Sequence, residues 1–432
     1  MKNVKLFLNQ KDIKRYEDWY SDDHKIDRDL QILHIQKGII LPCITFEESN
    51  IGKYYKGGVI DKNQVYIPLS GLYRNYNRIN QRHLLESTEG YTVPLEKIKY
   101  KSGSIIYGGI FQKHWGHFLL ESLSRLWFYY KNTELPIAFI YIDNKKPTEQ
   151  FLEAFELLGI PKDKIIFIDE PTQFDEVIVP EVSFILSHCA HNSFLIPFEK
   201  MAENIEPEKF TKIYISRTKW KQNQNLIGEE IFEKIFSENG YKIIYPETLS
   251  VREQISYIKG ADYIAGFIGS GIHNSVFAKS GTNIIILEKF SLINDTQGVI
   301  NLIKKLKVTH INTFYTFLPV AWGEGPFLAG ISKYLIDYMK KENFISIPPK
   351  AGINKNDLII FIKKWGETYK KSTGYMVNPN IEECIKLVNK IFDDNTVDYI
   401  EEDNKFNKLF SLQKIKNILN KNYYLIKYFL RK

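Results

Sequence analysis

The stretch Gly109–Trp127, GIFQKHWGHFLLESLSRLW, follows a short apolar strand predicted at 104–107 and itself predicts a helix over 116–130. Its apolar residues recur at the spacing of one buried helix face: Leu119, Leu123, Leu126, Trp127 and Tyr130. His117, Glu121 and Arg125 stand four apart on another face, so their side chains can meet. A histidine with a carboxylate one turn away is the minimum equipment for general-base catalysis. A surface ladder of His, Glu and Arg beside a core stripe is the alternative interpretation.

The residues that follow alternate between strand and helix patterns. The run 136–142 is continuously apolar, which is typical of a strand covered on both faces. A helix is predicted at 148–158, closed by Gly159. Strand patterns return at 164–168 and 176–179. This alternation favours a parallel, doubly wound sheet.

A second unit of the same kind begins after residues 187–207, a proline-containing connection. Strands are predicted at 212–216, 241–245, 262–265, 282–288 and 309–316, and helices at 229–237, 251–259, 272–279, 296–306, 331–342 and 379–392. Ser250 and Glu253 form a capping box for the helix at 251–259. In the connection, the cluster Ser187–His191 has no second Cys/His pair to complete a tetrahedral set, so we expect no metal site.

The chain length predicts more than one core. At 432 residues, with 44% hydrophobic residues, the sequence is that of a globular protein of two domains plus an extension. We expect a first domain over 1–205 with an irregular portion at 1–100, a second over 206–395, and a tail over 396–432. The fold class is α/β, with two Rossmann-like doubly wound domains facing a central cleft and a C-terminal helical extension.

Cysteine usage and hydropathy predict a cytoplasmic location. The three cysteines, Cys43, Cys189 and Cys384, are widely separated, which argues for a reducing compartment. No apolar run has the length or character of a signal peptide or a transmembrane helix.

The positive charge is concentrated in the tail. Residues 404–432 carry eight Lys or Arg and no acidic residue, so the rest of the chain carries −1 and gives no reason to expect nucleic-acid binding. Apolar residues interleave with these charges at Phe406, Leu409, Phe410, Ile415, Ile418, Leu419, Tyr423 and Ile426. A basic amphipathic helix suits peripheral contact with an anionic membrane on its inner face. The alternative is a helix packed on the body with a solvated basic face.

Several residues at predicted strand ends suit a phosphorylated ligand. The stretch Gly266–Asn274, with Gly269, Ser270, Gly271 and His273, follows a strand and opens a helix, so its backbone can approach a phosphate. It matches neither the dinucleotide fingerprint nor a P-loop. Ser216 and Arg217 follow the first strand of the same unit, where an arginine is placed for bidentate phosphate contact. Glu247 and Glu288 end two other strands, where carboxylates commonly take ribose hydroxyls.

These blocks together resemble family 61 glycosyltransferases. Gly116–Glu121 with Arg125-Leu126 is similar to the GHxLLE…RL signature of that family. The blocks Tyr214–Arg217, Tyr245–Gln254, Gly266–Asn274 and Gly281–Glu288 follow in the family's order and spacing, over about residues 100–320. The resemblance implies the GT-B architecture, a nucleotide-sugar donor bound mainly by the second domain, and inversion at the anomeric carbon without a bound metal or other cofactor.

Two positions depart from the family pattern. Ile268 stands where the family has a histidine, although His273 lies one turn further on. Gly228-Glu229 stands where the pattern has Asn-Glu, and the basic residues nearby are Lys219 and Lys221. Both departures lie in the expected donor site and leave the identity of the donor open.

The resemblance and the residues together predict an inverting glycosyltransferase acting on a growing surface glycan of the capsule or lipopolysaccharide type. His117 is the expected base, with Glu121 orienting it or acting as base itself. The expected donor-binding residues are Ser216, Arg217, Glu247, Gly269, Ser270, Gly271, His273, Asn274 and Glu288, with His114 and Arg125 on the acceptor side. The expected partners are a nucleotide-sugar, with UDP as the expected carrier, and a glycan or lipid-linked oligosaccharide. An inactive glycan-assembly subunit and a sugar-nucleotide epimerase of the same fold remain the alternatives.

Overall fold

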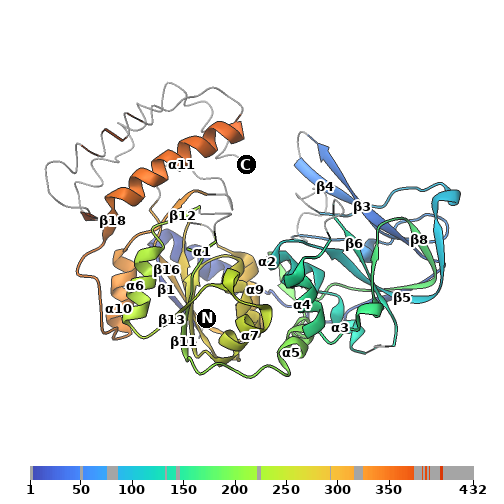
Figure 1. The fold of residues 1–432 in the computed structure, drawn as a ribbon, viewed down its shortest axis with the longest axis horizontal. Helices are drawn as coiled ribbons and strands as arrows, with labels where there is room; N and C mark the ends of the chain where they lie inside the picture. Colours follow the sequence, from blue (N-terminus) through green and yellow to red (C-terminus); the bar gives the residue numbers. More distant parts are fainter. Residues whose placement is uncertain are drawn as a thin grey trace.

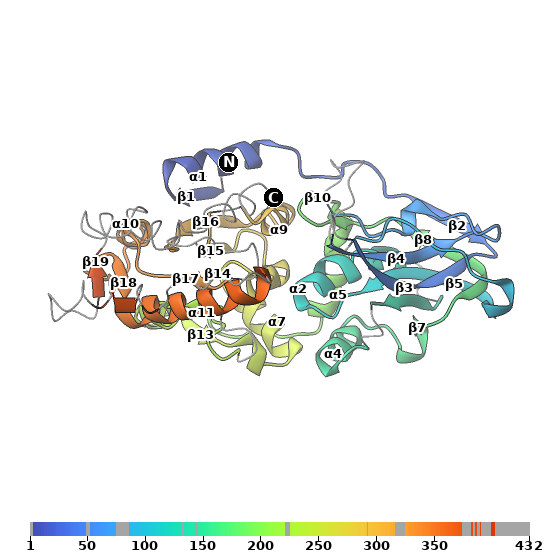
Figure 2. The same ribbon diagram turned by 90° about the horizontal axis from the view of Figure 1, so that it is seen from above.

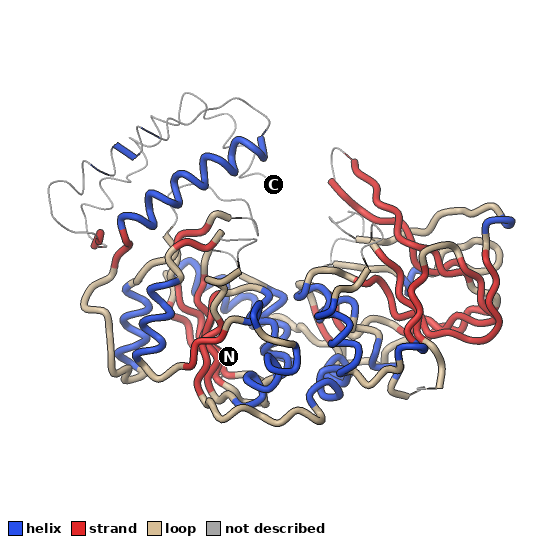
Figure 3. The backbone as a smooth tube through the Cα atoms, viewed as in Figure 1, coloured by secondary structure: helices blue, strands red, loops and turns tan. Residues whose placement is uncertain are grey.

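The structure is a computed structural model that describes residues 3–48, 52–74, 86–131, 134–142, 146–220, 225–291, 293–315, 325–373 and 399–401, with a few single positions between 382 and 389. Two lobes lie side by side, each with its own sheet (Figures 1 and 3). We call residues 23–205 the first lobe, and residues 3–22 with 206–373 the second lobe. The predicted α/β class is confirmed.

The second lobe is built on a six-stranded parallel sheet in the order β1-β16-β15-β14-β11-β13. Its strands are β1 (Val4–Phe7), β11 (Lys212–Ile215), β13 (Lys242–Ile244), β14 (Tyr263–Phe267), β15 (Asn283–Glu288) and β16 (Lys307–Asn312). Its main helices are α6 (Glu230–Glu238), α7 (Val251–Gly260), α9 (Asp295–Ile303) and α10 (Lys333–Lys341). The capping box predicted from Ser250 and Glu253 begins α7. The predicted parallel sheet is therefore confirmed here.

The N-terminal segment belongs to this second sheet. β1 pairs in parallel with β16, and α1 (Gln10–Ser21) packs against the same lobe, as Figure 2 shows. The hydroxyl of Tyr16 donates to Oε1 of Glu288 at 2.8 Å. The ring of Trp19 lies against Gly298, where an added Cβ would be only 2.2 Å from that ring. The expected domain over 1–205 thus does not include residues 3–21, because their hydrogen bonds are made with the other sheet.

The first lobe carries a mixed sheet rather than a purely parallel one. Its order is β4-β3-β8-β5-β6-β7, with β2 also paired to β8. The strands are β2 (Ile32–Gln36), β3 (Ile39–Glu48), β4 (Gly52–Ile60), β5 (Lys99–Phe111), β6 (Ile137–Tyr141), β7 (Ile165–Ile168) and β8 (Thr172–Pro180). β5 to β8 are parallel, as predicted, whereas β2, β3 and β4 are antiparallel additions from the portion expected to be irregular. α4 (Glu149–Leu157) covers this sheet, with Phe155 packed on Phe139 of β6, and α5 (Ile196–Ala202) packs against α4 and α7 at the junction of the lobes.

The helix expected over 116–130 is interrupted. α2 (Trp115–His117) passes into a π-helical turn over Phe118–Ser122, and α3 (Leu126–Tyr129) follows. The π-helical turn closes with Leu123 N–H donating to the Phe118 carbonyl at 3.2 Å. The hydroxyl of Ser122 donates to the carbonyl of Ile110 and accepts from the N–H of Gln112, which ties the turn to β5. The predicted core stripe is buried nonetheless.

Apart from the long helix α11 (Lys355–Thr373), the remaining elements are short. They are β9 (Phe184–Ile185), β10 (Cys189–Ala190), β12 (Leu226–Ile227), β17 (Phe327–Leu328), β18 (Gly352–Asn354), β19 (Tyr399–Glu401) and α8 (Ser270–His273), with 3₁₀ turns at Pro68–Ser70, Leu95–Lys97, Lys162–Lys164, Asn192–Leu195, Pro246–Thr248 and Asn274–Phe277. α8 with its 3₁₀ turn takes the place of the helix predicted at 272–279.

The long helix α11 (Lys355–Thr373) lies across the second lobe and points toward the first (Figure 1). The predicted helix at 379–392 and the basic tail lie almost wholly outside the described residues. Among the described helices, none has the length and apolar character needed to cross a bilayer.

Candidate active site

His117 and Glu121 form a hydrogen-bonded pair at the lobe interface. Nδ1 of His117 lies 2.7 Å from Oε2 of Glu121, so the predicted approach of these two side chains is present. A carboxylate only accepts hydrogen bonds, so Nδ1 carries the proton in this contact, and Nε2 is the nitrogen left to exchange a proton with a substrate. Glu121 is buried, whereas the His117 side chain is 29% exposed.

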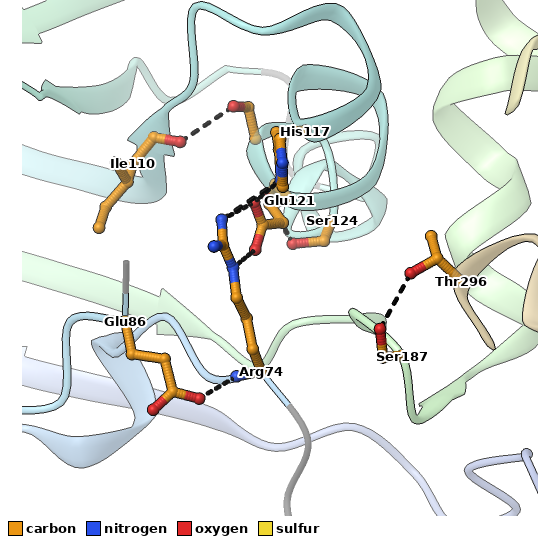
Figure 4. Close-up of polar contacts among 9 residues, drawn as sticks. Arg74, Glu86, Ile110, His117, Glu121, Ser124, Ser187 and Thr296 are labelled. Atoms are coloured by element: carbon orange, nitrogen blue, oxygen red, sulfur yellow. Dashed lines mark hydrogen bonds and ion pairs between the residues drawn. The ribbon is translucent and has the colours of Figure 1, made fainter. Parts of the chain in front are cut away.

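Arg74 completes this pair from a distant part of the chain. Its Nε lies 2.7 Å from Oε1 of Glu121 and its Nη2 lies 2.9 Å from Oε2, a bidentate ion pair (Figure 4). The backbone N–H of Arg74 donates to Glu86, which holds the segment in place. Burial raises the pKa of Glu121, but Arg74 and the hydrogen bond from His117 outweigh it and bring this pKa down to about 2. Glu121 is therefore a fixed anion at neutral pH.

A cavity of about 400 Å³ lies in front of this group and is lined by both lobes. His114 and His117 come from the first lobe, and Arg217, Gly269 and Ser270 come from the second. The rings of His114 and His117 lie 5.0 Å apart, and burial followed by the charge of His117 lowers the pKa of His114 to about 4. The volume of the cavity is in the range of small-molecule and cofactor sites.

Two cations converge on one glycine of the second lobe. A Cβ placed on Gly269 would lie 3.3 Å from Nη1 of Arg217 and 3.8 Å from Nζ of Lys289, and Gly269 has a φ of +150° that side-chain-bearing residues rarely adopt. Burial, then the charge of Arg217, lowers the pKa of Lys289 to about 8. The guanidinium of Arg217 also lies 4.5 Å from the ring centroid of Trp220. The part of the cavity around Gly269 suits an anionic ligand, because two cations face it and no Cβ keeps the ligand from the backbone.

The two lobes touch beside the cavity. Nε1 of Trp115 donates to Oδ1 of Asn274 at 2.7 Å. A Cβ on Gly116 would lie 3.2 Å from the ring of His273 and 3.3 Å from Cβ of Ser270, so a glycine lets α2 approach α8 closely. A further contact joins Ser187 and Thr296 at 3.2 Å (Figure 4).

Several residues predicted for the donor site lie outside the cavity lining. The hydroxyl of Ser216 is engaged by Glu233, the amide of Asn274 by Trp115 and Gln254, and Nδ1 of His273 donates to Oε1 of Gln297 at 2.7 Å. Oε1 of Glu288 accepts from Tyr16 and from His310. Glu247 is exposed, and Gly271 is not part of the lining.

Arg125 does not join His117 and Glu121. It is buried, with its guanidinium donating to the carbonyls of Pro180 and Gly71. A Cβ on Gly109 would lie 3.3 Å from its Nε, so Arg125 packs across the end of β5. The expected acceptor-side contact is thus not present at Arg125, whereas His114 lines the cavity.

Sequence reasoning missed the cation that holds Glu121 and part of the cavity wall. Arg74, which contacts Glu121, lies in the portion expected to be irregular, and Lys289, which lines the cavity, follows the glutamate that was singled out. Asp357, Ile360 and Lys364 come from α11, which lies between the helices predicted at 331–342 and 379–392 and was not itself predicted. The i, i+3, i+7 spacing of these three on one helix is the signal that was available.

Metal-ligating residues do not gather in the described part of the chain. Among those residues, no group of three or more His, Cys, Asp or Glu is placed to hold a metal ion. In the Ser187–His191 cluster, the ring of His191 accepts from the N–H of Ser193 and begins a 3₁₀ turn.

Comparison with known proteins agrees with the motifs. Residues 115–285 match the model of the family described as Glycosyltransferase 61, which confirms the resemblance to that family over this segment. No curated protein matches the chain. The matched segment contains His117, Glu121, Arg217 and Gly269, and it ends before Lys289 and α11.

Proposed function

We propose, from membership of glycosyltransferase family 61 over residues 115–285, that this protein transfers a sugar from a nucleotide-sugar donor to a glycan hydroxyl with inversion. The observation that carries the proposal is one cavity lined by two chemically different groups. A histidine held by a buried carboxylate lines it from the first lobe, and Arg217, Lys289 and Gly269 line it from the second.

His117 acts as the base in this proposal. Nε2 takes the proton of the acceptor hydroxyl while that oxygen attacks the anomeric carbon. Glu121 holds the ring in the required tautomer and stabilises the imidazolium that forms. Arg74 neutralises Glu121 and fixes its orientation, so it acts through the carboxylate rather than on the substrate.

Arg217 and Lys289 stabilise the leaving group. The bond between the anomeric carbon and the diphosphate breaks as the new glycosidic bond forms, and the negative charge on the diphosphate increases. Two cations placed beforehand in a partly buried site stabilise that charge without reorganisation. This chemistry assigns the leaving-group charge to side chains, which is the basis for proposing a metal-independent reaction.

The remaining features of the proposal concern setting and architecture. Two α/β lobes with a ligand cavity between them fit the GT-B type, with the donor held mainly by the second lobe. UDP is the proposed carrier, and a capsule-type or lipopolysaccharide-type glycan, presented on a lipid at the inner face of the membrane, is the proposed acceptor. The basic tail would bring the protein to that surface.

Thermal-shift titration tests the proposal. UDP, GDP, CMP, ADP and dTDP are each added with and without EDTA, because a ligand that binds only the folded state raises the unfolding midpoint. A response to one base, unaffected by EDTA, is the expected result. No response to any nucleotide would favour the inactive assembly subunit, and conversion of the donor without an acceptor would favour the epimerase.

A further inference from the structure

The helix α11 forms one wall of the cavity although it lies beyond the family match. α11 contacts β12, β17 and β18, and its apolar face is buried through Leu358, Phe361, Ile362 and Trp365. The side chain of Asn354 accepts from the N–H groups of Asn356 and Asp357, which fixes the start of the helix. The helix is therefore held on the second lobe by its own core contacts.

The opposite face of α11 points into the cavity. Asp357, Ile360 and Lys364 stand at i, i+3 and i+7 and all line the cavity. Ile360 is 43% exposed, so its side chain is open to a ligand in the cavity. Ile227 and Phe327 also line the cavity. This part of the wall is apolar, with a carboxylate at Asp357.

Asp357 has a carboxylate with no partner within the described residues. It lies over the backbone of Gly228, where a Cβ would be 3.3 Å from Oδ2 of Asp357 and 2.4 Å from the carbonyl oxygen of Ala329. Gly228 also has a φ of +90°. A glycine is therefore needed both for this backbone conformation and for the close approach of Ala329. Burial, then the charge of Glu230, raises the pKa of Asp357 to about 6. The carboxylate is still mostly ionised at neutral pH, and a half-buried anion without a partner is costly unless a ligand supplies donors.

Glu229, another carboxylate of the cavity lining, is already hydrogen-bonded within the protein. Oε1 of Glu229 accepts from the N–H of Arg217 at 3.2 Å and from the hydroxyl of Tyr214 at 3.4 Å. Burial raises the pKa of Glu229 to about 8, so this group is largely protonated at neutral pH. Glu288 and Glu247, the two carboxylates expected to take ribose hydroxyls, lie outside the cavity lining. Asp357 is thus better placed than any of these three to accept from a ligand.

Resting on the proposed function, we infer that α11 is the nucleoside-recognition element and that Asp357 accepts hydrogen bonds from the ribose hydroxyls of the donor. With the diphosphate between Arg217 and Lys289, the nucleoside extends along α11, and Ile360 packs against its apolar surface. A carboxylate accepts from the two neighbouring hydroxyls of a ribose at once, which a deoxyribose cannot match.

The test compares the affinities of ribo- and deoxyribonucleotides. Binding of UDP and 2′-deoxy-UDP, and of GDP and 2′-deoxy-GDP, is measured by calorimetry with the full-length protein. The unaltered protein is expected to prefer the ribonucleotide of the responding pair by about tenfold, since hydrogen bonds to charged groups are worth that much or more. In Asp357→Asn and Asp357→Ala this preference should fall to less than threefold, while the affinity for the deoxynucleotide should change little.

Asp337→Asn is the matched control, because Asp337 is an exposed aspartate on α10, away from the cavity. It should keep the full preference. A preference that persists in both Asp357 variants would overturn the inference and leave the proposed function standing. Absence of binding by the unaltered protein to any of these four nucleotides and to CMP, ADP and dTDP would overturn both. Circular dichroism of the variants separates loss of recognition from loss of folding.

Discussion

Nδ1 of His117 lies 2.7 Å from Oε2 of Glu121, although the chain passes from an α-helical to a π-helical turn between them. π-helical turns of this kind occur often at functional sites. The wider turn removes Arg125 from the face that a regular helix would give it. The cation beside the carboxylate is instead Arg74, 47 residues earlier in the chain.

Glu121→Gln should lower transfer by about 10²–10⁴-fold, the usual contribution of general acid–base catalysis. A glutamine amide can donate to Nδ1 and so favour the tautomer in which Nε2 carries the proton and cannot act as a base. Nucleotide affinity should stay within twofold, because Glu121 is not part of the cavity lining. Turnover assays with calorimetry check both expectations. Full activity in this variant would show that the pair has no catalytic role.

Arg74→Met should destabilise the protein by about 3 kcal/mol, the cost of leaving a buried charge without its partner. Arg74 helps to hold the pKa of Glu121 at about 2, below its usual 4.5. A depressed carboxyl pKa stabilises the folded state above pH ~4.5, and this contribution is lost as the pH falls toward 2. The variant should therefore lose most stability at pH 7 and less at pH 4, as measured by denaturant unfolding. Arg252→Met, at an exposed arginine on α7, is the control, and an equal effect there would contradict the account.

Arg217→Ala should weaken nucleoside diphosphate binding by about ten- to a hundredfold, the value of hydrogen bonds to a charged partner. The guanidinium lies beside Gly269, in the part of the cavity where the diphosphate is proposed to bind. Calorimetry with the nucleotide that responds best is the measurement. Lys279→Ala, at an exposed lysine, should bind normally, and unchanged affinity in Arg217→Ala would remove its phosphate role.

Nucleotide affinity should fall as the pH rises through about 8. Burial and the nearby Arg217 lower the pKa of Lys289 to about 8, so its charge is present below that pH and is lost above it. Glu229 and Glu288 act in the opposite direction on the same group. Lys289→Arg should keep its affinity to higher pH, because a guanidinium stays protonated. Titrations at pH 7, 8 and 9 test this, and identical pH profiles for the two proteins would contradict it.

The elements of the second lobe could be predicted because local patterns determine them. Short apolar runs predicted β11 and β13 to β16, and Ser250 with Glu253 predicted the start of α7. β1 could not be assigned to this sheet, because its pairing with β16 joins residues about 300 positions apart. The antiparallel strands β2, β3 and β4 lie in the portion expected to be irregular, and β2 and β3 join the sheet of the first lobe by pairing with β8, about 130 to 150 positions later.

Sequence patterns could predict the parts of the candidate site that lie on short motifs. Spacing alone brought His117 and Glu121 together, and the strand ends placed Arg217 and Gly269 at the cavity. Arg74 reaches the site through tertiary contacts that leave no local pattern. Asp357 shares a helical spacing with Ile360 and Lys364, but nothing in that spacing shows that the helix lies against the cavity. His273 and Asn274 fit the expected motif, yet hydrogen bonds to Gln297, Trp115 and Gln254 engage their side chains.

The central claim is that His117 activates a hydroxyl for attack on a bound nucleotide-sugar. The most direct measurement is release of free nucleotide from a panel of UDP-, GDP-, CMP-, ADP- and dTDP-sugars in EDTA and in the presence of a lipid-linked glycan acceptor, by the unaltered protein and by His117→Ala, with donor affinity measured in parallel. The account predicts that the unaltered protein consumes one donor class and that His117→Ala binds that donor equally well but releases nucleotide about 10²–10⁴-fold more slowly. Release by His117→Ala at the rate of the unaltered protein would contradict the account.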